Sequence, residues 1–454
     1  MSHKLDQKSL LKGILTLSVP TMMGMLFEPL YEIVDMAWVS RLSINSVAAV
    51  TIFATLWWIL NMVNDIVGTS SVSIISRYYG SGNKEKTIEA IEQTIIFKFI
   101  LALVVGILMS FIIPFVLRPL AVNDEVLELS TLYGRIRLLT LPLAFSSYTV
   151  NTALRCIGDA KKPFYLMAFS GILNVILDPI MIFDTVPVIG MKGMGLGIAG
   201  AAYATVISQA LAFLVGLYIL MSGRTHVKIG FKRGIYFVKS LDIKLLTIGL
   251  PTGIEGLLRN LGTFLIMRYI ASYGVTVVAA YGICTRIIGL ISMPVFGLQM
   301  GTSIIVGQKL GASDCSSAER AGYLTAWLSL GIFLAAGLIM FGFPSLIMGI
   351  FTESKEIIDI GKVFLRFFTF AALIMGPAGA LASILNGAGD NMPSMLGALA
   401  SVWLVQIPLL YVFVSMLDLS IEWVWATYIF EYVVQFVIVF FFVKRGKWRD
   451  KCVI

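Results

Sequence analysis

The sequence contains few of the residues on which enzymes, redox proteins and ATP-driven pumps depend. Its 454 residues include four cysteines and two histidines. The cysteines stand singly, at positions 156, 284, 315 and 452, so they form no metal-binding or redox motif. No G-x-x-x-x-G-K-[ST] loop occurs, and the chain therefore has no recognisable means of hydrolysing ATP. Because a nucleophile–base constellation is also missing, we predict that the protein is not an enzyme and uses no cofactor.

Charged residues are scarce as well. They make up 13% of the sequence, whereas hydrophobic residues make up 58%. A soluble core could not hold so much apolar side chain, so the exterior must face lipid. A spanning helix needs roughly 20 apolar residues. Twelve such stretches occur, with cores near 14–39, 48–75, 94–117, 127–152, 163–183, 197–222, 245–271, 277–305, 321–350, 357–384, 394–416 and 423–443. We therefore predict an all-α membrane protein with twelve transmembrane helices.

The basic residues indicate how these helices are oriented. With an even number of spans, both termini lie on one side of the membrane. That side would carry most Lys and Arg residues, which fall within 4–12, 77–86, 155–162, 224–244, 309–320 and 444–451. The positive-inside rule then places both termini in the cytoplasm. We expect a multi-pass protein of the plasma membrane. The net charge of +8 reflects this orientation and does not indicate nucleic-acid binding.

The two halves of the chain align at a constant shift, so that adding 231 to a position in the first half gives its counterpart in the second. TLSVPT at 16–21 matches TIGLPT at 247–252, and Gly-Asp at 158–159 matches Gly-Asp at 389–390. Each half holds six spans, so both copies enter the membrane in the same direction, as in transporters built from parallel repeats. We predict an N-lobe at 1–222, a basic cytoplasmic linker at 223–244 and a C-lobe at 245–454.

Acidic residues within the spans gather in the N-lobe. Ionisable groups at this depth cost about 2.5–3.5 kcal/mol or more and persist where they face a partner or an aqueous cavity. Glu28, Glu32 and Asp35 lie on one face of the first span. Asn174 and Asp178 are one turn apart in the fifth. Other polar groups of the N-lobe spans are Asn61, Asn64, Asp65, Tyr133, Asn151 and Thr205.

The C-lobe differs at the equivalent positions. Adding 231 turns the positions of Asp35 and Asp178 into Ile266 and Leu409. A symmetric scaffold therefore carries an asymmetric acidic site. In the C-lobe, Glu255 lies four residues before Arg259 and is a ready ion-pair partner for it, whereas Glu431 has no obvious partner.

Structural interpretations compete with the functional ones. Asp35 and Asp178 could form a buried hydrogen-bonded pair, and Asp65 could join helices as a polar contact. Glu28 and Glu32 could lie near the outer headgroups, where acids cost little.

The chain resembles the multidrug and toxic compound extrusion (MATE) family over essentially its whole length. The resemblance rests on VDMAWVSRL, on the turns SRYYGSGN and GQKLGASD, and on ALRCIGDAKKP, NVILDPIMIF and IAGAAYATVISQ. The combination of Asp35, Asn174 and Asp178 resembles the DinF-like branch, in which N-lobe acids bind the coupling cation. The neighbouring residues that the resemblance assigns to this site are Tyr133, Asn151 and Thr205. It implies that organic compounds are extruded by antiport against Na+ or H+.

We expect a mechanism of alternating access between the two lobes. Asp35, Asp178 and Asn174 would take up Na+ or a proton from outside and thereby change the shape of the substrate cavity. Oxygen ligands suit Na+ and paired carboxylates suit H+, so the ion stays open. Residues of a possible additional or substrate-binding site are Glu28, Glu32, Asp65 and Asn61. The expected partners are small organic, cationic or amphipathic substrates and the lipid bilayer, without nucleic acid or ATP, and we expect a monomer.

An alternative function is a flippase for lipid-linked precursors. Such a protein needs basic residues that hold phosphates. The candidates are Arg135, Arg137, Arg259, Arg286 and Arg366. The acidic first lobe argues against this function.

Overall fold

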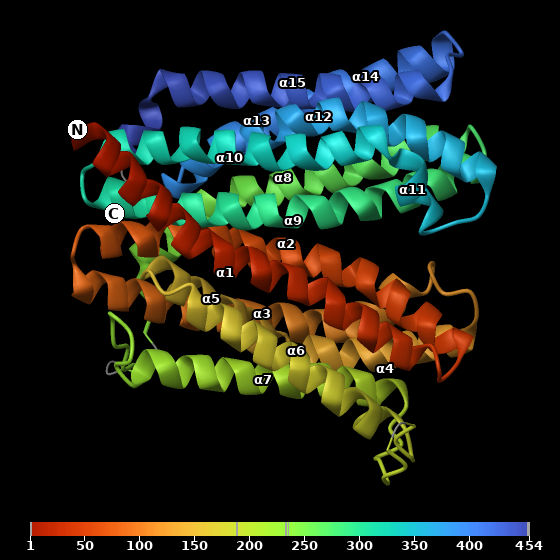
Figure 1. Ribbon diagram of the computed structural model, residues 1–454. Helices are drawn as coiled ribbons and strands as arrows, with labels where there is room; N and C mark the ends of the chain where they lie inside the picture. Colours follow the sequence, from red (N-terminus) through yellow and green to blue (C-terminus); the bar gives the residue numbers. More distant parts are fainter. Residues whose placement is uncertain (1, 188, 232–233, 235, 452–454) are drawn as a thin grey trace. The chain divides into compact units, whose positions relative to one another are not determined.

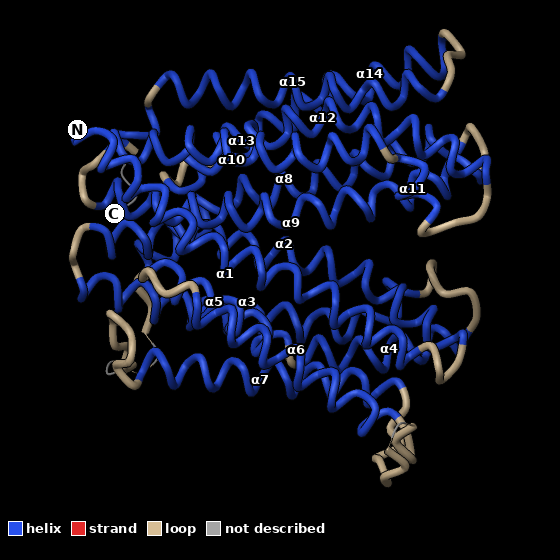
Figure 2. Tube along the Cα trace, viewed as in Figure 1, coloured by secondary structure: helices blue, strands red, loops and turns tan. Residues whose placement is uncertain are grey.

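The computed structural model describes residues 2–187, 189–231, 234 and 236–451, and the side chains of residues 2–7 and 28 lie outside that description. The described residues form helices joined by turns and by longer loops after α6 (Lys161–Ile182) and α7 (Ile198–Met221) (Figure 1, Figure 2). Their β-structure is limited to one isolated bridge between Thr185 and Lys192. The predicted all-α fold is confirmed.

The helices give twelve crossings among the described residues. In chain order they are α1 (Ser2–Val39), α2 (Ile44–Gly80), α3 (Lys84–Leu117), α4 (Asp124–Leu139) with α5 (Leu141–Cys156), α6 (Lys161–Ile182), α7 (Ile198–Met221), α8 (Lys239–Ala271), α9 (Val275–Gly311), α10 (Cys315–Gly342), α12 (Lys355–Gly387), an irregular segment and α15 (Ile421–Arg445). The irregular segment joins α13 (Met392–Ala398) and α14 (Ile407–Leu410) through wider π turns at Leu399–Gln406 and Tyr411–Met416. A short α11 (Pro344–Gly349) follows α10, and a 3₁₀ turn (Lys447–Asp450) follows α15.

Ten of these crossings are long and apolar enough to span a membrane by length and composition alone. Of the other two, one is broken in its middle and one carries several charged residues. The α4–α5 crossing breaks at Thr140, just before the Pro142 that lies in the first turn of α5. Helix α8 carries Glu255, Arg259 and Arg268 along its length.

The chain packs as two compact units, each with its own core. Unit 1 consists of Met1–Met22, Ser76–Gly82 and Thr247–Ile454, and unit 2 consists of Met23–Ile75 and Asn83–Leu246. The first half of α1 and the last turns of α2 therefore pack with the C-terminal helices. The remainder of both helices belongs to unit 2. Helix α1 is thus one continuous helix whose residues up to Met22 belong to unit 1 and whose residues from Met23 belong to unit 2.

Within unit 1, the ends of α2 and α9 pack through residues that the repeat makes equivalent. A Cβ atom added to Gly80 would overlap the carbonyl oxygen of Gln308. Reciprocally, a Cβ atom added to Gly311 would overlap the carbonyl oxygen of Arg77. The shift of the internal repeat relates Gly80 to Gly311 and Arg77 to Gln308. Each repeat therefore makes the same contact with the other.

Ser76 and Gly307 are equivalent in the repeat and also contact each other. A Cβ atom on Gly307 would overlap Ser76 Oγ. Two equivalent residues in contact lie on either side of a local pseudo-twofold axis, which here relates the ends of α2 and α9. The predicted parallel repeat is therefore visible as a crossing of two helices.

The paired Gly-Asp turns also have matching backbone structures. Gly158 has φ +89° and Gly389 has φ +75°, a left-handed conformation that glycine adopts without a Cβ clash. The amide of Asp159 donates to the carbonyl five residues upstream at 3.0 Å, and that of Asp390 does the same at 2.8 Å. Both turns are thus glycine caps that end a helix on the same side of its repeat.

The basic linker after α7 is held against α3. The Oε1 atom of Glu92 accepts hydrogen bonds from the amides of Gly230 (2.9 Å) and Phe231 (2.8 Å). Glu92 is 6% exposed. A buried acid of unit 2 therefore fixes the path of the linker.

Candidate ion-binding site

The candidate site lies in unit 2 and is built on α6. Asn174 and Asp178, one turn apart, are 2% and 0% exposed. Asn174 Nδ2 donates to Asp178 Oδ1 at 3.1 Å and lies 3.5 Å from Thr205 Oγ1 on α7. Pro179 follows Asp178 inside the helix. Because proline has no N–H, the carbonyl of Val175 lacks its helical donor, which adds a main-chain acceptor to this turn.

Helix α1 brings Asp35 to the same place. The carboxyl groups of Asp35 and Asp178 lie within hydrogen-bonding reach of each other. The half of α1 that belongs to unit 2 packs on α6 through Phe27 and Phe164, whose ring centroids are 5.9 Å apart. Two acids that are far apart in the sequence therefore form one pair.

Helix α4 supplies an aromatic hydroxyl beside this pair. Tyr133 is 6% exposed. The charges of Arg137, Asp35, Asp178 and Glu32 all act on its hydroxyl group. The structure thus brings Asp35, Tyr133 and Asp178 together with Asn174 and Thr205, from four helices.

Arg137 is a member of this cluster that the sequence prediction did not place there. Its positive charge attracts both Asp35 and Glu32. The guanidinium lies over the ring of Trp57, 4.4 Å from its centroid. The signal that could have revealed it is its position one turn after Tyr133, because residues i and i+4 of a helix share a face.

Several oxygen atoms of the site have no hydrogen-bond donor among the described residues. They are Asp35 Oδ1, Asp178 Oδ2 and Asn174 Oδ1, all buried. A buried acceptor left without a donor costs about 1–3 kcal/mol. Two ionised carboxylates about 4 Å apart would repel by about 4 kcal/mol at an effective dielectric constant near 20. A proton or a hard cation, which prefers oxygen ligands, relieves both costs.

The other predicted residues form no hydrogen bond with this pair in the part of the chain that the structure describes. Asn151 is in α5 with Oδ1 buried and without a partner among the described residues. In α2, Asn61 is half-buried and Asp65 is exposed. In the described part of the chain, none of the three hydrogen-bonds to Asp35. Glu32 is exposed but interacts electrostatically with Asp35.

Glu28 lies in α1, and its side chain is outside the described residues.

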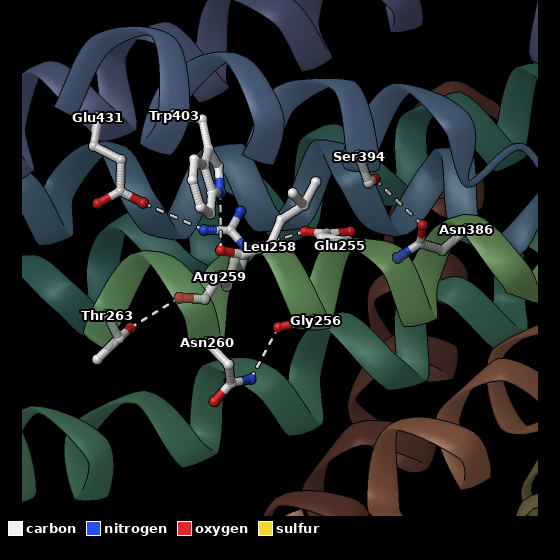
Figure 3. A network of polar contacts seen from close by, with 10 residues as sticks. All are labelled: Glu255, Gly256, Leu258, Arg259, Asn260, Thr263, Asn386, Ser394, Trp403 and Glu431. Carbon is white, nitrogen blue, oxygen red and sulfur yellow. Dashed lines mark hydrogen bonds and ion pairs between the residues drawn. The ribbon is translucent and has the colours of Figure 1, made fainter. Parts of the chain in front are cut away.

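Unit 1 contains a different charged cluster (Figure 3). Arg259 Nε donates to Glu255 Oε1 at 3.2 Å, and its Nη1 donates to Glu431 Oε1 at 3.3 Å. The predicted ion pair of Glu255 with Arg259 is confirmed. The expectation that Glu431 lacks a partner is wrong, because α15 carries it to α8. Nearby, Trp403 Nε1 donates to the carbonyl of Leu258 at 3.0 Å.

A comparison with protein families identifies the scaffold. The MatE family model matches the chain twice, over residues 20–180 and 251–412. The chain belongs to the MatE family. Its two matched segments begin at equivalent positions of the internal repeat.

Relatives of this MATE-family chain match it over almost its full length. The probable multidrug resistance protein YoeA of Bacillus subtilis is 27% identical over 99% of this chain and 97% of the relative. The probable multidrug resistance protein NorM of Thermotoga maritima is 24% identical over 98% of this chain and 94% of the relative. The solved structure of a MOP superfamily transporter from Pyrococcus furiosus has a TM-score of 0.87 and 26% identity, covering 97% of each chain. The chain is thus a transmembrane transporter with the MATE fold, and its place in the DinF-like branch stays a prediction.

Proposed function

We propose that this transporter exports organic compounds by antiport against Na+ or H+, with Asp35 and Asp178 as the ion-binding centre. The observation that carries the proposal is the carboxyl pair, in which one buried oxygen of each acid, Asp35 Oδ1 and Asp178 Oδ2, has no donor among the described residues. Asn174, Thr205 and Tyr133 complete the proposed site, and the resemblance adds Asn151. The names of the multidrug resistance relatives support substrates of the multidrug type. We propose that these compounds are cationic or amphipathic.

Helix α1 offers a route from ion binding to a change of shape. When an ion neutralises Asp35 and Asp178, their repulsion disappears and α1 can pack more closely on α6. The two helices are neighbours at Gly171, where an added Cβ atom would lie 3.3 Å from the ring of Tyr31. Since α1 continues into unit 1, a shift at this contact also changes the packing of residues 8–22.

Coupling requires that the ion favours one conformation over the other. An ion that bound both conformations equally would shift nothing, however tightly it bound. The proposed difference is the Asp35–Asp178 separation, since a shared proton or cation holds the two acids together and an empty pair drives them apart. Substrate release and ion uptake would then alternate.

The flippase alternative receives less support from the same side chains. Arg259 is engaged by two carboxylates, and Arg137 is attracted by Asp35 and Glu32. An incoming phosphate would have to compete with these acids. Of the candidate phosphate-binding arginines, these two are therefore already occupied by protein partners.

The remaining parts of the proposal follow from the sequence. We propose that an N-lobe at 1–222 and a C-lobe at 245–454 move relative to each other about the linker at 223–244. We also propose that the protein is a monomer in the plasma membrane with both termini in the cytoplasm. Glu28, Glu32, Asp65 and Asn61 are proposed as additional or substrate-binding residues.

The function is tested with purified protein in proteoliposomes, with Na+ and pH gradients imposed separately. The substrate panel contains fluorescent organic cations and a lipid pyrophosphate. We expect organic cations to move against their gradient when one of the two ion gradients is present and to stop when it is collapsed. Movement of the lipid pyrophosphate alone would favour the flippase, and movement independent of both gradients would contradict antiport.

A further inference from the structure

Lys98 is a buried cation in the middle of α3, and 1% of the residue is exposed. Its Nζ atom has no hydrogen-bond partner among the described residues. The atom lies 4.7 Å from the ring centroid of Tyr148 and 6.0 Å from that of Phe145, both on α5. Cation–π contacts recover about 0.5–2 kcal/mol. Since a buried charge without a partner costs more than that, Lys98 needs an opposite charge nearby.

Helix α2 provides both the opposite charge and the space for Lys98. The electrostatic partner of Lys98 is Asp65. One turn further along α2, a Cβ atom on Gly68 would lie 3.8 Å from Lys98 Nζ and 3.3 Å from the ring of Tyr148. Glycine at this position therefore lets the ammonium group approach α2 on the Asp65 side.

The carboxylate of Asp65 remains open to a ligand. Asn64 Nδ2 reaches its Oδ1 atom only at 3.5 Å, and Asn64 Oδ1 itself has no partner among the described residues. Lys98 interacts with Asp65 by charge attraction, and no hydrogen bond joins the two among the described residues. Asp65 is exposed near the midpoint of α2. At that depth an exposed carboxylate faces water or a bound molecule, because hydrocarbon would not tolerate it.

An aromatic ring lies on the same face of α2. Trp58, seven residues before Asp65, is 70% exposed. Residues seven apart lie two helical turns apart on one face, about 10 Å along the axis. A flat organic cation of that length can stack on the indole and present its charged group to the carboxylate, since cations are attracted to the face of a Trp ring.

We propose that Asp65 binds the cationic group of an exported compound, and that Lys98 is the positioning residue that keeps the Asp65 carboxylate ionised. This inference rests on the proposed export of organic cations. Asp65 is open on one side, but at this depth in the membrane its surroundings are less polar than bulk water, which favours the protonated carboxyl group. A buried ammonium group next to it favours the ionised form. The groups that face Asp65 are Lys98 from α3 and Asn64 from α2, while Tyr148 from α5 covers Lys98.

The test is the binding of ethidium to the purified full-length protein in detergent, measured by fluorescence between pH 6 and pH 9. We expect wild-type affinity to change little over this range. Lys98→Met should weaken binding about tenfold near neutral pH, which corresponds to the loss of about 1.4 kcal/mol. Its affinity should recover as the pH rises, because Asp65 then ionises without help. Lys98→Arg should behave as the wild type does.

Further variants separate positioning from a structural role. Asp65→Asn should bind weakly at every pH, and Lys98→Met should add nothing to it in the double variant. If Lys98→Met does not fold, Lys98→Gln gives the same measurement with a polar group in place. Equal affinity of wild type and Lys98→Met, or a loss that does not change with pH, would overturn the role of Lys98. Absence of ethidium binding by the wild type, if it extends to the other organic cations of the panel, would overturn the proposed function itself.

Discussion

Replacing Arg259 by methionine should destabilise the protein far more than removing the charge of Glu255. Arg259 bonds to Glu255 at 3.2 Å and to Glu431 at 3.3 Å. The Glu431 side chain is 6% exposed and the Glu255 side chain 20%. Without Arg259, Glu431 is left as a buried acid without a counter-charge. Breaking a buried pair from one side costs about 3–5 kcal/mol.

Glu255→Gln is the matched comparison. Arg259 then keeps Glu431, and the glutamine oxygen can still accept from Nε, so the loss should be about 1 kcal/mol. Thermal unfolding of the detergent-purified variants measures the difference as a larger fall in Tm for Arg259→Met. The double variant Arg259→Met/Glu431→Gln should regain most of the loss, because it removes the charge of the more deeply buried of the two acids. A Tm for Arg259→Met at or above that of Glu255→Gln would refute this reasoning.

Two further changes test the packing of each unit. Gly307→Val places methyl groups against Ser76, beside the local pseudo-twofold axis of α2 and α9, and should cost about 1–3 kcal/mol through overpacking. Thermal unfolding should show a lower Tm than for Gly331→Val, the control at a position where a Cβ atom meets no neighbour. Equal Tm values for the two variants would contradict the crossing of α2 and α9. Glu92→Ala removes the acceptor of two linker amides and should speed trypsin cleavage between residues 224 and 244, since hydrogen bonds to a charged group contribute about 1.5–3 kcal/mol. The exposed Glu85→Ala on the same helix is its control, and unchanged cleavage by Glu92→Ala would show that the linker is held by other contacts.

Most of the fold could be predicted because apolar length and internal repetition are properties of the sequence itself. The twelve apolar cores and the constant shift between the halves needed no knowledge of packing. The helices nevertheless extend beyond those cores, as α3 does by starting at Lys84 where the apolar core starts near 94. Polar residues can continue a helix outside the hydrocarbon, and hydropathy does not register them.

The candidate site could be predicted only where its residues share a helix. The i, i+4 spacing of Asn174 and Asp178 places both on one face of α6, and the structure shows them hydrogen-bonded. The approach of Asp35 to Asp178 joins two helices, so no periodicity could give it, and the family resemblance pointed to it instead. Lys98 has no distinctive signal in the sequence, because one lysine near the start of an apolar core is typical of an interfacial anchor. Its burial depends on Gly68 and Tyr148, which lie on two other helices.

The pairing of Glu431 with Arg259 had no signal in the sequence either. The two residues are far apart in the chain, on α15 and α8. The internal repeat relates each N-lobe acid to one position of the C-lobe, and Asp35 and Asp178 correspond to Ile266 and Leu409. Glu431 lies at a position without an N-lobe acid counterpart, so this relation could not have placed it.

The most direct test of the account is whether a substrate expels an ion from the Asp35–Asp178 pair. Purified protein is mixed with an organic cation in weakly buffered detergent solution, and released protons are followed with a pH indicator while displaced 22Na+ is counted in parallel. We predict ion release by the wild type, and none by Asp35→Asn or Asp178→Asn at substrate concentrations that saturate each variant. Release from both variants in the wild-type amount would contradict an ion-binding role for the two acids.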